Sequence, residues 1–196
     1  MKRLILLLLF ASSTLFATAQ FGVKLGVNIS NVGGDDAVDN KALIGYYIGV
    51  YYNAEISPVF SFQPELVYSA EGAKYDDGSG DDFKLLLNYL KVTALFRYNL
   101  PSGLFFATGP QLGALMSANV KADGEKVDVK DQFKGTNFAW SFASGYMSAG
   151  GIGFYVRYDY GLANIVDDAE ADLKLRNISI GLRYNFGTGG GEARKR

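Results

Sequence analysis

The sequence predicts an all-β protein: an eight-stranded antiparallel transmembrane up-and-down β-barrel with short periplasmic turns and long extracellular loops. Three observations lead to this prediction. Eight segments alternate apolar and polar residues, their connections are alternately short and long, and an export signal stands at the N-terminus. Alternation with a period of two places neighbouring side chains on opposite faces of an extended strand.

The first residues have the features of a cleaved signal peptide. Two basic residues, Lys2 and Arg3, precede an apolar stretch from Leu4 to Phe10, and the small-x-small motif "ATA" ends at Ala19. We expect cleavage after Ala19, which divides the chain into a signal peptide (1–19), an outer-membrane β-barrel (20–186) and a flexible C-terminal tail (187–196). The alternative is an uncleaved anchor helix, which the short apolar stretch disfavours.

The alternation is clearest in the stretch "GFYVRYDYGLANI", residues 153–165. Phe154, Val156 and Tyr158 fall on one face, whereas Arg157 and Asp159 fall on the other. The same pattern recurs over 21–30, 43–56, 60–70, 86–100, 104–118, 136–146 and 177–186. These lengths are close to the ~9–11 residues with which a tilted strand crosses a bilayer.

The connections between the segments follow a regular order. Three are short: 57–59, 101–103 and 147–150. The other four are long and polar: 31–42, 72–85, 119–135 and 164–174. An even number of strands, joined by alternately short and long connections, is typical of outer-membrane barrels.

The two faces of the segments distinguish a membrane barrel from a secreted barrel of lipocalin type, which would hold its apolar face inward around a ligand. The polar face is rich in Gly, Ser, Asn and Gln, which suits the narrow interior of a small barrel. The apolar face is broad and has aromatic residues near the strand ends, as in interfacial girdles: Tyr46, Phe60, Tyr98, Phe106 and Tyr146. We therefore expect the apolar face to contact lipid.

Nine charged residues fall on the polar face and are predicted to form a structural network in the lumen: Lys24, Glu55, Glu65, Glu71, Lys91, Arg97, Arg157, Asp159 and Arg183. Isolated buried charges are costly, so these residues should pair. A hairpin-register estimate names Glu65 and Arg97 as one pair. Together with Tyr47, Tyr51 and Tyr155, the network should fill the lumen, although a polar pathway for a solute or proton is the alternative.

Composition narrows the chemistry further. The chain has no His and no Cys, which removes His-dependent hydrolysis, thiolate sites and the common zinc and haem sites. The net charge is −1 and no basic cluster occurs, which argues against nucleic acid. We predict no enzyme, no cofactor, and no catalytic or metal-binding residue. Acidic loops, around Asp35, Asp76, Asp81, Asp167 and Asp172, suggest that divalent cations bridge them to lipopolysaccharide.

Several stretches together resemble the PorT-like outer-membrane β-barrel family of Bacteroidetes: "FGVKLGVNISN", "FSFQPELVYSAEGAK", "LNYLKVTALFRYNL", "GLFFATGPQLGALMSA", "YVRYDYGLANI" and "ISIGLRYNF". The resemblance implies an outer-membrane barrel, often described as porin-like, with no catalytic residues. We expect a structural, accessory or surface-interaction protein in contact with outer-membrane lipid and lipopolysaccharide. Whether a protein partner also binds, at the extracellular loops or on the periplasmic side, is left open by the sequence. A passive channel for small solutes is the alternative, and a lipid-modifying enzyme ranks third.

Overall fold

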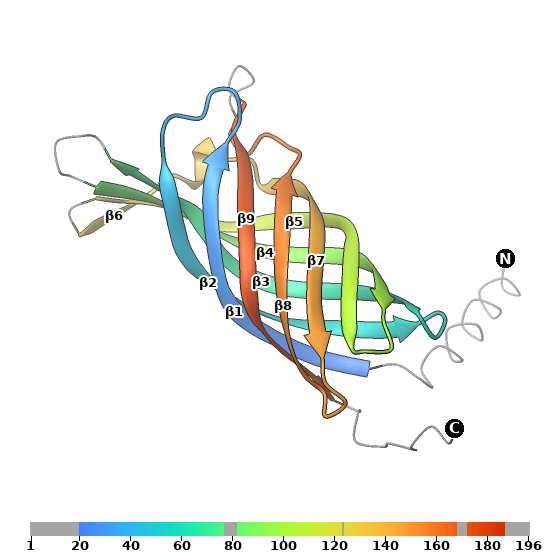
Figure 1. Ribbon diagram of the computed structural model, residues 1–196. Coiled ribbons are helices and arrows are strands. Elements are labelled where there is room, and N and C mark those ends of the chain that lie inside the picture. The colour runs from blue at the N-terminus through green and yellow to red at the C-terminus, as the bar shows by residue number, and fades with distance from the viewer. Residues whose placement is uncertain (1–19, 77–81, 123, 168–171, 187–196) are drawn as a thin grey trace, which may run out of the picture.

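The computed structural model describes residues 20–76, 82–122, 124–167 and 172–186 (Figure 1). The predicted signal peptide and C-terminal tail lie outside these ranges. No helix within them is long and apolar enough to span a membrane. The described chain is almost entirely β-strand: β1 Gln20–Gly33, β2 Lys41–Glu55, β3 Phe60–Asp76, β4 Asp82–Asn99, β5 Leu104–Ala122, β6 Glu125–Asp128, β7 Thr136–Met147, β8 Ile152–Gly161 and β9 Lys174–Phe186, with one short 3₁₀ turn, η2 Lys130–Gln132.

The sheet closes on itself. Each strand of the ring pairs antiparallel with the next one in the chain, except that β5 pairs with β7 past β6, and β1 pairs with β9 from Phe21↔Phe186 to Gly33↔Lys174. The short strand β6 lies outside this ring and pairs only with the far end of β5. The ring therefore has eight strands, and the predicted closed antiparallel barrel is confirmed.

The two ends of the barrel differ in their connections. At one end the turns are short: Glu55 to Phe60, Asn99 to Leu104 and Met147 to Ile152. Gln20 and Phe186, the first residue of β1 and the last of β9, also lie at this end. At the other end, the far ends of β3 and β4 project together with β6 beyond the rest of the barrel (Figure 1).

Two of the predicted long loops are wrong in extent. The stretch 72–85 was expected to be a loop, but β3 and β4 stay paired to Asp76↔Asp82. The stretch 119–135 likewise contains paired strand, because β5 continues to Ala122 and folds back as β6. The polar composition of these segments is typical of loops and did not reveal their strand character. They remain strands because continued backbone pairing satisfies their amide and carbonyl groups.

The two faces of each strand are as predicted. In β8, Phe154 and Val156 are 57% and 46% exposed, whereas Tyr155 and Arg157 are only 4% and 3% exposed. The outer surface of the ring is correspondingly covered by large apolar side chains from every strand. An apolar outside around a polar inside is the arrangement of a barrel whose solvent is lipid.

Glycines in the wall make room for tyrosines in the lumen. A Cβ atom added to Gly26 or Gly181 would lie 2.6 or 2.0 Å from the Tyr47 hydroxyl oxygen, and one added to Gly22 would lie 2.2 Å from Tyr51 Cζ. Both tyrosines project from β2 along the inner wall toward β1 and β9, the next two strands of the ring. The small residues of the predicted polar face thus have a packing role, since two bulky rings press against them.

Replacing Val156 by Arg should destabilise the barrel by about 2–4 kcal/mol, because its side chain points outward at mid-strand and would place a charge in lipid. Equilibrium unfolding by urea in lipid vesicles measures this. The control is Ala149→Arg, in the exposed turn between β7 and β8. Equal free energies of unfolding for the two variants would contradict a lipid-facing outer surface.

Candidate functional site: the barrel lumen

The lumen contains three zones along the barrel axis. Unpaired arginines stacked on aromatic rings lie nearest the short turns, a charge-balanced network occupies the middle, and an apolar cluster closes the long-hairpin end. Each zone is built from inward-facing residues of several strands.

The first half of the middle network centres on Glu65 of β3. Lys24 of β1 donates to Glu65 Oε2, and Arg157 Nη1 of β8 lies 2.5 Å from the same oxygen. Arg157 also donates through Nε to Asp159 Oδ1 at 2.7 Å. One glutamate thus connects strands on different sides of the ring through two cations.

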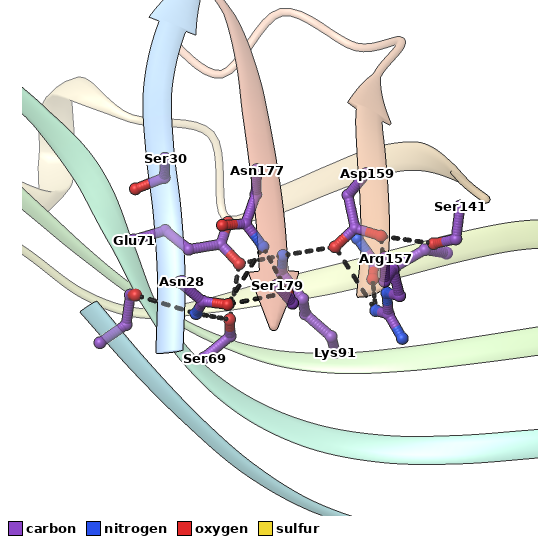
Figure 2. Close-up of polar contacts among 12 residues, drawn as sticks. Asn28, Ser30, Ser69, Glu71, Lys91, Ser141, Arg157, Asp159, Asn177 and Ser179 are labelled. Atoms are coloured by element: carbon purple, nitrogen blue, oxygen red, sulfur yellow. Dashed lines mark hydrogen bonds and ion pairs between the residues drawn. The ribbon is translucent and has the colours of Figure 1, made fainter. Parts of the chain in front are cut away.

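The second half of the network centres on Lys91 of β4. Lys91 donates to Glu71 Oε1 and lies 3.5 Å from Asp159 Oδ2. Hydroxyl groups also donate to two of the carboxylates: Ser141 Oγ donates to Asp159 at 2.7 Å, and Ser69 Oγ donates to Glu71 at 2.6 Å. Figure 2 shows these contacts converging from separate strands.

The middle network is electrically balanced. It holds three cations (Lys24, Lys91, Arg157) and three carboxylates (Glu65, Glu71, Asp159), all at most 5% exposed. Asn28 extends it with neutral groups, since it donates to Ser69 Oγ at 2.8 Å and accepts from Ser179 Oγ at 2.8 Å (Figure 2). Such a network stabilises only as a set, because removing one member leaves an uncompensated buried charge.

Arg97 and Arg183 lie outside this balance, toward the short turns. Arg97 stacks over the Phe105 ring at 3.9 Å, and Arg183 stacks over the Tyr51 ring at 4.1 Å. Both donate to one oxygen, Gln63 Oε1, at 3.2 and 2.7 Å. Within the described ranges, no carboxylate oxygen lies within 4.0 Å of either guanidinium. Ring faces and an amide oxygen replace carboxylates as their partners.

The structure corrects two of the sequence expectations. Glu65 and Arg97 are not a pair: Glu65 lies opposite Thr93, and Arg97 lies opposite Ser61. The register estimate was off by four residues. Glu55, predicted to face the lumen, is exposed at the end of β2 beside the short turn. The other eight charged residues of the predicted network are buried inside the barrel.

The long-hairpin end of the lumen is apolar, which the sequence analysis missed. Its buried members are Val32, Ala73, Leu85, Leu87, Tyr89, Leu115, Ala118, Ile165 and Leu175. The seven that precede Ile165 are inward-facing strand residues near the polar segments that had been assigned to loops. Following the same inward face beyond Lys91 of β4 would have revealed them, because Tyr89, Leu87 and Leu85 continue it.

Two connections pass over this cluster and are tied to each other. Ile165 is 1% exposed, and its backbone oxygen accepts from Lys134 N at 2.9 Å. Phe133 forms a bridge with Val166, and Asp167 N donates to Gln132 O at 3.1 Å. The apolar cluster is therefore capped by ordered backbone as well as by side chains.

The acidic loop residues do not gather into a metal site. Asp172 accepts from Lys174 Nζ at 2.8 Å, and Asp172 N donates to Asp36 Oδ2 at 2.7 Å. Asp81 lies outside the described residues. Across the parts of the chain that the structure describes, no group of three or more acidic residues could hold a metal ion. Divalent bridging therefore stays a prediction.

Comparison with known protein families agrees with the observed fold, a closed sheet that is apolar on the outside and surrounds a polar lumen. The model of the family described as "Outer membrane protein beta-barrel domain" matches residues 10–167. The chain belongs to this family. It is accordingly an outer-membrane protein, and by the rule for this class the short turns face the periplasm and the long hairpins face outside.

Solved structures share the fold. Neisserial surface protein A (NspA) is 17% identical, with a TM-score of 0.58 over 86% of this chain and 99% of that chain. Ail, the attachment invasion locus protein of Yersinia pestis, was solved in complex with the heparin analogue sucrose octasulfate; it is 17% identical, with a TM-score of 0.52 over the same shares. No curated protein matches the chain. At these identities, the likeness concerns the fold alone.

Glu65→Gln should destabilise the barrel by about 3–5 kcal/mol, because it leaves Lys24 and Arg157 without their shared carboxylate. Adding Lys24→Met restores the charge balance and should recover part of the loss. Equilibrium unfolding in detergent micelles measures both. The control is Glu65→Gln with Arg97→Met, which should recover less because Arg97 does not contact Glu65. Equal recovery by the two double variants would contradict the observed pairing.

Ile165→Asp should open the apolar cap, because it places a carboxylate among buried apolar side chains. Hydrogen exchange at the Lys134 and Asp167 amides should accelerate, since both bonds depend on the seating of this segment. Amides in the middle of β8 should keep their protection. Unchanged exchange at Lys134 would show that Ile165 does not hold the two connections together.

Proposed function

We propose that this protein is a small non-enzymatic outer-membrane β-barrel with a side-chain-filled lumen, in a structural, accessory or surface-interaction role. The observation that carries the proposal is that the lumen is blocked at two separate levels. Ion pairs join β1, β3, β4 and β8 across its middle, and an apolar cluster fills its outer end. Conduction would require both barriers to open.

Bulky rings fill the space that the ion pairs leave. Tyr47, Tyr51 and Tyr155 are each at most 4% exposed, and the rings of Tyr47 and Tyr155 meet edge to face at 6.1 Å. Eight strands give an interior that side chains can fill. What remains for interaction is the outside: the lipid-facing wall and the extended hairpins β3–β4 and β5–β6.

Several finer assignments belong to this proposal. The resemblance carried by "QPEL" and "GPQLG" supports a place among PorT-like barrels of Bacteroidetes, and the motif "ATA" supports export with cleavage after Ala19. We propose lipopolysaccharide as the outer-leaflet partner, since the hairpins rise from the wall at that side. A protein partner could bind the same hairpins or the periplasmic turns.

One observation favours the alternative, a passive channel for small solutes. Arg97 and Arg183 lie in the periplasmic half of the lumen without a carboxylate partner in the described chain, and unpaired cations in a pore wall attract anions. The middle network and the apolar cap lie between these arginines and the outside. A channel would therefore need a second conformation.

In planar bilayers the intact protein should show no steady ohmic conductance, because both barriers are packed. A triple variant, Tyr47→Ala, Tyr51→Ala and Ile165→Ala, removes bulk from both levels and should give measurable current. Replacing Val38, Ala149 and Val127 by Ser, in exposed connections and in β6, is the matched control. A reproducible open channel from the unmodified protein would overturn the filled-barrel proposal and favour the channel.

A further inference from the structure

Five lysines form a row across adjacent strands at the extracellular end of the wall. The register pairs Lys41 of β2 with Lys74 of β3, Lys74 with Lys84 of β4, Lys84 with Lys121 of β5, and Lys121 with Lys126 of β6. Neighbouring strands are about 4.8 Å apart, so this lysine row is roughly 19 Å long. Figure 1 shows the ends of β3 and β4 projecting together with β6 on one side of the barrel.

The lysine row faces outward. In β4, Leu85 is buried in the apolar cluster, so its neighbour Lys84 points to the other face; in β5, Val120 packs against that cluster and Lys121 points away. Lys121 and Lys126 are exposed, and Lys74 and Lys84 are partly exposed. The ammonium groups are thus presented to the surroundings of the barrel and not to its lumen.

Four of these lysines are not neutralised by the described chain. Lys74, Lys84, Lys121 and Lys126 form no salt bridge there, whereas Lys174 on β9 does pair with Asp172. Like charges directly opposite each other on neighbouring strands are destabilising. A row of such pairs is most stable when an anion lies along it.

An amphipathic groove adjoins the row on its membrane side. Lys126 is one of its lining residues, together with Ile44, Tyr46, Tyr68, Leu86 and Asn88. The rings of Tyr46 and Tyr68 lie 6.2 Å apart on the outer face, next to the exposed side chains of the lipid-facing wall. The groove thus connects the cationic row to the apolar band of the barrel.

The acidic residues of β6 lie on both sides of the row. Glu125 pairs with Ala122, one position beyond the Lys121–Lys126 pair, whereas Asp128 pairs with Asn119, two positions nearer the membrane. An anion that approaches from the bilayer along the groove meets Lys126, which is one of its lining residues.

We propose that the lysine row and the groove below it bind a phosphorylated glycolipid of the outer leaflet, with its phosphates on the lysines and an acyl chain in the groove. The inference rests on the proposed surface role and adds a site to it. The source of the phosphate is a lipid headgroup and not a free anion, because a free anion has no acyl chain to occupy the amphipathic groove beside the row. Lysine ammonium groups bind phosphate as point charges, so a row of them fits a headgroup with more than one phosphate.

The test uses the purified, folded barrel in detergent micelles that are doped with bis-phosphorylated lipid A, dephosphorylated lipid A or phosphatidylcholine. Native mass spectrometry and titration measure how tightly the barrel binds each lipid. We expect preferential binding of the bis-phosphorylated lipid, which weakens as salt is raised. The double variant Lys84→Gln with Lys121→Gln removes two adjacent lysines of the row. It should weaken that binding by roughly fivefold per lysine, because each cation near an anionic lipid surface contributes a comparable factor.

The matched control is Lys130→Gln with Lys134→Gln, which removes the same charge from the extracellular side outside the row. It should bind as the wild type does. A third variant, Tyr68→Ala, alters the groove and should weaken lipid A binding without changing the response to inorganic phosphate. Circular dichroism and heat-dependent electrophoretic migration confirm that each variant is folded, and Lys84→Gln alone replaces the double variant if that one does not fold.

Equal binding of phosphorylated and dephosphorylated lipid A would overturn the proposal, as would equal loss in the row and control variants. Full competition by inorganic phosphate at matched ionic strength would assign the row to free anions and also overturn it. Aggregation of the row variants with unchanged lipid affinity would mean that the lysines only protect the edge strand β6. The conductance experiment is independent of these outcomes, so failure of this site leaves the filled-barrel proposal standing.

Discussion

The structure depends first on backbone hydrogen bonding in a medium that offers none. Inside a bilayer every N–H and C=O group must find a partner within the protein, so a sheet can cross only if it has no edge. Pairing of β1 with β9 over thirteen residue pairs meets this condition. Closure then fixes which face meets lipid and which encloses the lumen. The charge network, the stacked tyrosines and the apolar cap all follow from having a narrow interior to fill.

Charge inside that interior is handled in two ways. In the middle, cations and carboxylates are equal in number, and each contacts an oppositely charged partner. Nearer the periplasm, Arg97 and Arg183 are held by aromatic faces and by Gln63. Arginine suits the second arrangement better than lysine does, because its planar, weakly hydrated guanidinium can stack on a ring.

The period of two allowed the sequence to predict the strands and their faces, since only the local alternation is needed. Pairing across the lumen was out of reach. Lys24 and Glu65 lie on β1 and β3, which are not neighbours, so their contact depends on strand tilt and on the shear of the closed ring. The Glu65–Arg97 error had a more local origin: the pairing began at Phe60↔Tyr98, and a shift of the turn moves every opposing residue. The lysine row was missed for a related reason, because its members are spread over four connections of the chain and their alignment depends on the register of each pair of strands.

The pairing of β1 with β9, which closes the ring, also affects the order in which the barrel folds. Its partners, such as Phe21 and Phe186, stand at opposite ends of the barrel sequence, whereas every other pair of neighbours in the ring is joined by a connection that is local in sequence. Closing the longest loop carries the largest entropy cost and brings no contact until nearly all of the barrel strands are in place. Hairpins can therefore form early, but the ring closes last, and until then two unpaired strand edges are open to aggregation. An unclosed sheet of this length would depend on a chaperone or an assembly partner to shield those edges.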